Sequence, residues 1–204
     1  MSYSDFFESV TGRSPFPYQV RFANDLVAGK PPDIISVPTG CGKTNTILCG
    51  FLYHLTVSPR FRRLVFSLPM RSLSSQVAET AERLVAASKL DVGVHLMMGG
   101  AVNRDWVQTP DRPVILVGTQ DQVLSRAINR GYGMTPFQWA MDFGLINSDA
   151  LFVFDETQMM GVGAQTSVAL QRLRDQLGCV GSTHTIWMSA TNAAMETSLE
   201  RIDA

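Results

Sequence analysis

The stretch Ile34-Ile35-Ser36-Val37-Pro38-Thr39-Gly40-Cys41-Gly42-Lys43-Thr44 decides the fold of this chain. Its first four residues are mostly apolar and β-branched, which is typical of a buried strand. Downstream, Ile47 and Phe51 are four residues apart, which is the spacing of one helix face. A loop that ends in Gly-Lys-Thr and joins a strand to a helix has the setting that a phosphate-binding P-loop requires.

The P-loop is expected to bind ATP and Mg²⁺. Its glycines let backbone N–H groups and the helix N-terminus face the phosphates without a clashing side chain. Lys43 would reach the β- and γ-phosphates, and the Thr44 hydroxyl would bind the metal. The alternative is an ordinary glycine-rich turn, because Val37 stands where the full motif begins with glycine. The expected nucleotide contacts of the loop are Thr39, Gly40, Cys41, Gly42, Lys43 and Thr44.

An acidic pair, Asp155 and Glu156, directly follows the apolar run 151–154. Because active sites of open α/β sheets gather at the carboxyl ends of the strands, we expect both carboxylates to lie beside the P-loop. Asp155 would hold Mg²⁺, and Glu156 would orient and activate the attacking water, provided that the chain turns there. The alternative is a solvated acidic loop after a buried strand.

Short apolar runs recur along the chain, mostly without polar alternation, and therefore predict strands that are covered on both faces. Six such runs are 34–37, 64–68, 92–96, 114–117, 151–154 and 185–188. Stripes with helical spacing lie between them, at 47–55, 77–88 and 168–177. Alternating strands and helices predict an α/β fold with a mainly parallel sheet and helices on both faces.

Composition narrows the class of protein. The 204 residues fit one compact domain, and a net charge of −1 gives no overall basic excess for nucleic acid. Three cysteines without a CxxC pair disfavour a disulfide framework or zinc site and favour a reducing compartment. The N-terminus does not resemble a secretory signal, and no apolar run approaches the roughly 20 residues of a membrane span. We therefore expect a cytoplasmic protein that does not contact membranes.

Taken in order, these motifs resemble the first RecA-like domain of superfamily 2 helicases of the DExD/H type. The P-loop corresponds to motif I, and the acidic pair begins motif II, which extends to Gln158. The resemblance implies that Tyr18 and Gln19 form a glutamine motif, with Gln19 reading the adenine edge. Motif III, Ser189-Ala190-Thr191, would couple the state of the phosphates to the nucleic-acid cleft. The implied catalytic residues are Lys43, Asp155, Glu156 and Gln158.

The same resemblance implies contacts to single-stranded DNA. In this family, small polar side chains and amides between motifs I and II grip the sugar-phosphate backbone, and such contacts position a strand without reading its sequence. The alternative is that these are ordinary loop residues at the edge of the sheet. The residues that match are Pro69, Arg71, Ser72, Gly100, Thr119 and Gln120.

A narrower resemblance is to the helicase part of the CRISPR-associated helicase-nuclease of type I systems, and to its type I-U (I-G) branch. It rests on residues 117–122, 125–126, 129–133 and 155–161. It implies a CRISPR surveillance complex as a partner in antiviral defence. No His-Asp dipeptide is present, so the metal nuclease of that family is not expected in this chain.

We expect residues 1–30 to form an N-terminal flap with the glutamine motif, and 31–204 to form the first RecA-like ATP-binding domain. The second RecA-like half, with its arginine fingers, is not expected within this chain, so the chain alone should hydrolyse ATP poorly. The expected function is the ATP-binding half of an ATP-dependent DNA helicase or translocase. Two alternatives are a P-loop phosphotransferase acting on a small metabolite and a nucleotide-binding regulatory module without motor activity.

Overall fold

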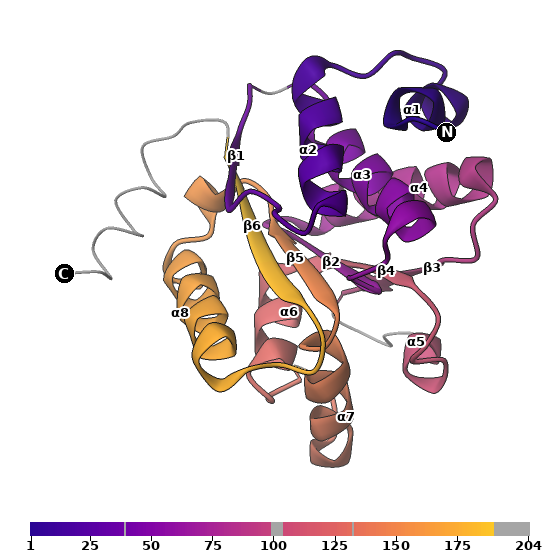
Figure 1. The fold of residues 1–204 in the computed structure, drawn as a ribbon. Coiled ribbons are helices and arrows are strands. Elements are labelled where there is room, and N and C mark those ends of the chain that lie inside the picture. The colour runs from indigo at the N-terminus through magenta and orange to yellow at the C-terminus, as the bar shows by residue number, and fades with distance from the viewer. Residues whose placement is uncertain (39, 99–103, 132, 190–204) are drawn as a thin grey trace.

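A six-stranded sheet, parallel throughout, forms the centre of the molecule in the computed structural model, which describes residues 1–38, 40–98, 104–131 and 133–189 (Figure 1). The strand order is β1-β6-β5-β2-β4-β3. Each of the six apolar runs forms one strand, so the sequence prediction of an α/β fold with a parallel sheet is confirmed. The strands are β1 (Ile34–Ser36), β2 (Arg63–Leu68), β3 (Gly93–Met97), β4 (Val114–Thr119), β5 (Ala150–Phe154) and β6 (Thr183–Ser189).

Helices cover both faces of this sheet (Figure 1). One layer contains α1 (Tyr3–Thr11), α2 (Pro17–Val27), α3 (Lys43–Val57) and α4 (Arg71–Ser88). The other contains α5 (Asp105–Gln108), α6 (Gln120–Ala127), α7 (Pro136–Ile146) and α8 (Val162–Leu177). A short 3₁₀ helix, η1 (Thr157–Met159), follows β5.

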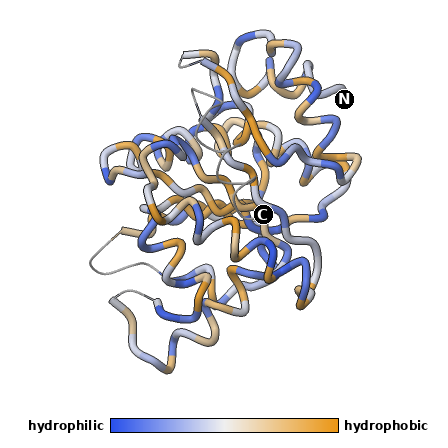
Figure 2. The backbone as a smooth tube through the Cα atoms, turned by 90° about the vertical axis from the view of Figure 1, so that its left-hand side faces the viewer, coloured by the Kyte–Doolittle hydropathy of each residue, from blue (hydrophilic) through white to orange (hydrophobic). Residues whose placement is uncertain are grey.

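Successive side chains of the central strands point alternately to the two faces of the sheet, and each face forms a hydrophobic core with one layer of helices. Phe66 and Val153 pack with the first helix layer, whereas their neighbours Val65 and Phe152 pack with the second. Successive side chains of a strand point to opposite faces, so a run buried on both sides must be apolar at every position. In Figure 2, where the backbone is coloured by the hydropathy of each residue, hydrophobic residues predominate in the centre and hydrophilic residues are more frequent at the periphery.

The N-terminal segment forms two helices that pack into the core of the domain. Tyr3–Thr11 form α1 and Pro17–Val27 form α2, and the side chains of Phe6, Phe22 and Leu26 lie in the same core as α3 and α4. A capping box between Ser2 and Asp5 begins α1. The division of the chain into a flap at 1–30 and a domain at 31–204 stays a prediction.

A buried histidine joins α3 to the loop before β2. His54 is fully buried, and its Nε2 accepts hydrogen bonds from the backbone N–H groups of Arg60 (2.8 Å) and Phe61 (3.1 Å). Burial, with a smaller effect of the Arg60 charge, lowers the pKa of His54 to about 4. The imidazole is therefore held neutral, as a hydrogen-bond acceptor, near neutral pH.

A buried ion pair joins α6 to α7. Nε of Arg126 lies 3.4 Å from Oδ2 of Asp142, and each residue is only 1% exposed. Arg104 also pairs with Asp142, and Arg126 donates to the side-chain oxygen of Gln122 at 2.6 Å. The carboxylate of Asp142 thus compensates two cations in the second helix layer.

Candidate nucleotide-binding site

The loop after β1 has the backbone of a phosphate cradle. Gly40 (φ +83°) and Gly42 (φ +79°) both adopt the left-handed region that disfavours side chains. A Cβ on Gly42 would also lie 3.2 Å from Nε2 of Gln19. The helix α3 begins at Lys43, directly after this turn, so its free N–H groups face the space in front of the loop. Thr39 lies outside the described residues.

Lys43 presents a buried ammonium group to this space. The residue is 8% exposed, and within the described part of the chain its Nζ has no hydrogen-bond partner. The nearest opposite charge is Oε1 of Glu156, at 3.8 Å. A buried ammonium that faces carboxylates without a direct hydrogen bond still has donors to satisfy, so this position favours an additional anionic acceptor.

The acidic pair turns toward the P-loop through the backbone of Glu156. Glu156 has φ 52° and ψ 49°, in the left-handed region, and η1 begins directly after it. This turn satisfies the condition that two adjacent side chains share one site. A non-glycine residue in this conformation is strained, and such strain persists only where the contacts of the surrounding structure keep the residue in place.

Asp155 is buried at the carboxyl end of β5. Oδ1 accepts a hydrogen bond of 2.9 Å from the N–H of Glu156, and the Asp155 N–H donates to the carbonyl of Ser67 at 3.0 Å. Burial raises the pKa of Asp155 to about 6, in spite of that hydrogen bond and the nearby charge of Lys43. A positive ligand beside this carboxylate would therefore relieve an existing cost.

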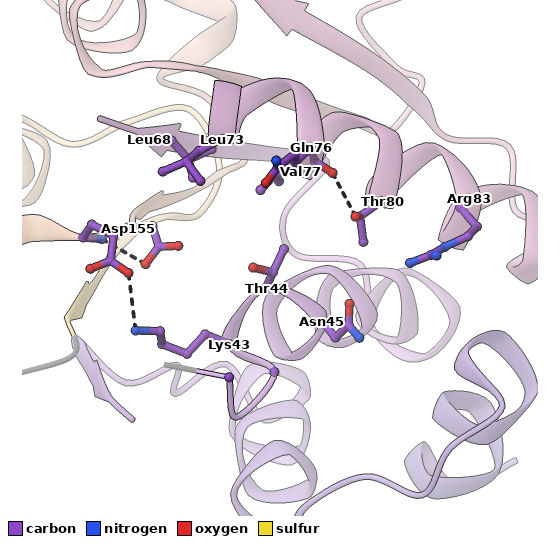
Figure 3. A pocket seen from close by; sticks show the side chains of 13 residues that line it. Lys43, Thr44, Asn45, Leu68, Leu73, Gln76, Val77, Thr80, Arg83 and Asp155 are labelled. Carbon is purple, nitrogen blue, oxygen red and sulfur yellow. Dashed lines mark hydrogen bonds and ion pairs between the residues drawn. The ribbon is translucent and has the colours of Figure 1, made fainter. Parts of the chain in front are cut away.

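These groups line a single cavity of about 450 Å³. Lys43, Thr44 and Asp155 point into it from α3 and from the end of β5 (Figure 3). Glu156 and the two loop glycines complete the end of the cavity at the P-loop, and residues of α4 form the opposite wall. The structure therefore brings together the P-loop and the acidic pair, which are more than 100 residues apart in the sequence.

Gln158 connects the acidic pair to β6. Its Nε2 donates a short hydrogen bond to Oε2 of Glu156, and its Oε1 accepts one of 3.0 Å from the Ser189 hydroxyl. Motifs II and III are thus in direct contact through one amide. Ala190 and Thr191 lie outside the described residues, so their coupling role stays a prediction.

Tyr18 and Gln19 form hydrogen bonds to the P-loop and to the first turn of α3. The Tyr18 hydroxyl donates to the carbonyl of Cys41 at 2.5 Å, and Nε2 of Gln19 donates to the Thr46 hydroxyl at 2.9 Å. Oε1 of Gln19 accepts from the N–H of Phe16 at 2.9 Å. The adenine contact expected of Gln19 stays a prediction. Thr46 is a partner that the sequence did not reveal, because it belongs to no motif.

Four of the expected nucleic-acid contacts share a second cavity, of about 670 Å³. Pro69, Arg71, Thr119 and Gln120 line it, where the neighbouring parallel strands β2 and β4 end. Ser72 lies in the exposed first turn of α4, and Gly100 lies outside the described residues. The remaining lining residues were not among the expected contacts, and they are Asp121, Gln122, Leu124, Ser125, Ile128, Gly163 and Thr166.

A parallel sheet with a phosphate loop after β1 and an acidic pair after β5 defines a RecA-like P-loop nucleotide-binding domain. The sequence model of the DEAD/DEAH box helicases matches residues 16–198. The chain therefore belongs to this family of ATP-hydrolysing helicases. No curated protein sequence matches it.

Solved helicase structures share the fold. The DUF1998 helicase MrfA bound to DNA and AMPPNP superposes with a TM-score of 0.73 at 15% identity, covering 98% of this chain and 27% of that one. Dbp5 L327V of S. cerevisiae bound to RNA and ADP BeF3 gives 0.62 at 17% identity, covering 98% and 47%. This chain thus spans about a quarter to a half of the length of these proteins.

Two properties of the described residues concern membranes and metals. None of the helices there is both long and apolar enough to cross a membrane. Within the same residues, no three His, Cys, Asp or Glu side chains gather in a way that could hold a metal ion by themselves.

Proposed function

We propose that this chain is the ATP-binding half of a Mg²⁺-dependent helicase or translocase that acts on single-stranded DNA. The observation that carries the proposal is the cavity at which Lys43, Thr44, Asp155 and Glu156 meet. The proposal is also supported by membership of the DEAD/DEAH box helicases and by the fold shared with MrfA, which was solved with DNA and AMPPNP.

The first step is capture of the triphosphate by Lys43 and the N-terminus of α3. Nζ of Lys43 is buried and lacks a hydrogen-bond partner within the described residues, so a phosphate oxygen would supply what the folded chain leaves unsatisfied. The weak pairing with Glu156 at 3.8 Å would give way to this stronger contact. Glu156 would then be released to face the terminal phosphate.

The donor set beside Lys43 fits Mg²⁺. Thr44 and Asp155 present a hydroxyl and a carboxylate to the same cavity, and oxygen donors are what this hard cation prefers. The bound ion would neutralise charge on the β- and γ-phosphates. Burial already raises the pKa of Asp155, so a cation there would stabilise its ionised form.

The hydrolytic role falls to Glu156. Its left-handed backbone turns the carboxylate toward the Lys43 end of the cavity, where it would orient a water and accept its proton. Gln158 fixes one carboxylate oxygen of Glu156 from the side of β6, so the other oxygen is free to act. A second RecA-like half would supply arginines to the transferring phosphoryl group, which is worth about 10³–10⁵ in rate in related enzymes.

The nucleic-acid side of the proposal uses the cavity lined by Pro69, Arg71, Thr119 and Gln120. Their polar atoms and the first turns of α4 and α6 suit phosphate oxygens of a single strand. Closure of two RecA-like halves on ATP, and opening after hydrolysis, would move the strand past this surface.

We further propose that the motor acts in type I CRISPR interference. The support is in the sequence stretches 117–122 and 129–133 and in Gln158 of motif II. Co-purification of the full-length protein with a CRISPR surveillance complex tests this narrower role. Failure to associate with that complex, alongside normal DNA-stimulated ATPase activity, would contradict the CRISPR role and leave the motor function standing.

Titration calorimetry with Mg-ATP tests the central proposal. Lys43→Ala should abolish measurable binding, because it removes the cation that faces the phosphates. Lys89→Ala is the matched control, since Lys89 is an exposed lysine at the end of α4 and outside the cavity. Equal affinities for Lys43→Ala and the unsubstituted chain would refute the phosphate-binding role.

A further inference from the structure

A third cavity, of about 360 Å³, lies in the second helix layer. The C-terminal parts of α6, α7 and α8, which lie together on one face of the sheet, form its walls (Figure 1). Among the described residues, it shares none of its lining with the nucleotide cavity and only Ile128 with the cavity assigned to nucleic acid. The third cavity therefore needs an explanation of its own.

The apolar walls of the third cavity are exposed. Leu177 is 81% exposed, although it is a leucine on a helix that packs against the sheet. Phe143, Ile128 and Leu173 are 41%, 46% and 48% exposed. Single apolar side chains on a surface are ordinary, but several that gather around one cavity indicate a surface that another molecule covers.

Arg174 places a cation among these apolar walls. It lines the cavity although it is only 8% exposed, and its Cζ lies 4.0 Å from the centre of the buried Phe152 ring. Nε donates to Oδ1 of Asn147 at 2.9 Å, which is the one hydrogen bond of this side chain among the described residues. No carboxylate of those residues forms an ion pair with it. Its charge and its remaining N–H groups are therefore left for an acceptor from outside.

Asn147 holds this guanidinium in place. Its Nδ2 donates to the carbonyls of Ala127 at 3.3 Å and Phe143 at 2.9 Å, so its amide is fixed by both α6 and α7. The Phe152 ring supports one face of the guanidinium of Arg174. A cation fixed in this way loses little side-chain freedom when it binds a planar carboxylate.

We propose that the third cavity binds a segment of a partner protein in which an Asp or Glu side chain lies between apolar side chains. The carboxylate would accept hydrogen bonds from Arg174, and its apolar neighbours would cover Leu173 and Leu177. A strand of nucleic acid fits less well, because its phosphates would lose water against the apolar walls. Since Ile128 lines both cavities, the partner would lie beside the nucleic-acid cavity.

Peptides selected on the full chain from a phage-displayed library of random sequences test this proposal. Alkylation of Cys179 by N-ethylmaleimide, followed by mass spectrometry, reports occupancy, because this thiol lines the cavity and is only partly buried. Cys49 is buried and serves as an internal control for unfolding. Selected peptides should carry Asp or Glu between apolar residues and slow the alkylation of Cys179. Replacing that residue by Asn or Gln should weaken binding about 10- to 100-fold, the range of a hydrogen bond to a charged group.

Two variants locate the binding in the cavity. Arg174→Met keeps a long side chain over Phe152 but removes the cation, so it should weaken the carboxylate peptides about 10- to 100-fold and leave their amide versions unchanged. A merely structural role of Arg174 would weaken both alike. Leu177→Asp changes an exposed position and should abolish binding of both, which keeps the test decisive if Arg174→Met does not fold. Val57→Asp is its control, because Val57 is 51% exposed at the end of α3, in the other helix layer.

Four results would overturn the proposal. One is a selection that yields no peptide able to slow the alkylation of Cys179, and another is equal affinity for the carboxylate and amide versions of a peptide. Protection of Cys179 by oligothymidine would show that nucleic acid occupies the cavity. A dimer of the chain in sedimentation that Leu177→Asp dissociates and Val57→Asp does not would show that the occupant is a second copy.

Discussion

The stability of this domain should fall in acid because of His54. In the fold its Nε2 accepts two backbone hydrogen bonds, and only the unprotonated nitrogen can do so. The unfolded chain binds a proton at this ring near pH 6.5, but the folded chain does so only near its pKa of about 4. The unfolded state therefore gains a proton first as the pH falls, and unfolding becomes easier.

The magnitude follows from these two pKa values. The contribution of His54 to the free energy of unfolding is fully present above pH 6.5 and is lost as the pH falls from 6.5 to about 4. At 1.36 kcal/mol for each pH unit between the two pKa values, the loss is about 3 kcal/mol. This is a large part of the roughly 5–15 kcal/mol that stabilises an ordinary domain.

Urea unfolding, followed by circular dichroism between pH 4 and 7.5, would measure this contribution. His54→Gln keeps an acceptor but cannot titrate, so its free energy of unfolding should fall by about 3 kcal/mol less than that of the unsubstituted chain over this range. What is compared is the change in the free energy of unfolding with pH, because the loss of packing in His54→Gln lowers that free energy by a similar amount at every pH. His184→Gln is the control for removing a partly exposed histidine. Parallel pH profiles of His54→Gln and the unsubstituted chain would refute this reasoning.

Two further predictions concern the catalytic carboxylate and the second helix layer. Glu156→Gln in the complete motor should keep ATP affinity and lower kcat about 10²- to 10⁴-fold, the usual contribution of a general base; turnover near normal would rule out that role. Asp142→Ala should lower the free energy of unfolding by about 3–5 kcal/mol, because Arg126 would stay buried without its counter-charge. Chemical denaturation checks it, and a loss below about 1 kcal/mol would mean that water or another group satisfies Arg126.

The sheet and the phosphate loop were predictable because each is encoded locally. A strand covered on both faces must be apolar at each position, so β5 shows in the sequence as an unbroken run. By contrast, α7 was not predicted, although Pro136 and the Thr135–Gln138 contact mark its start. Its residues are apolar around most of the helix, with Phe137 93% exposed, so no amphipathic stripe indicated a buried face.

The site was predictable as far as its motifs extend. Lys43 and Asp155 were identified because their residue types and their places after strands restrict their roles. Thr46, which hydrogen-bonds Gln19, and Arg83, which lines the far end of the cavity, were not identified, because only the packing of α3 against α2 and α4 gives them these positions. The sequence analysis required a turn after Asp155, but it did not predict the left-handed backbone of Glu156, since a non-glycine residue gives no local signal for that conformation.

The side chain at position 158 has to be both a hydrogen-bond donor and a hydrogen-bond acceptor. Its nitrogen serves the carboxylate of Glu156 while its oxygen serves the hydroxyl of Ser189, so the group must donate at one end and accept at the other. Glutamate has the same length but would set a second negative charge against Glu156, and leucine would serve neither neighbour. A primary amide on this stem meets both demands without carrying charge, which makes glutamine a restrictive choice there.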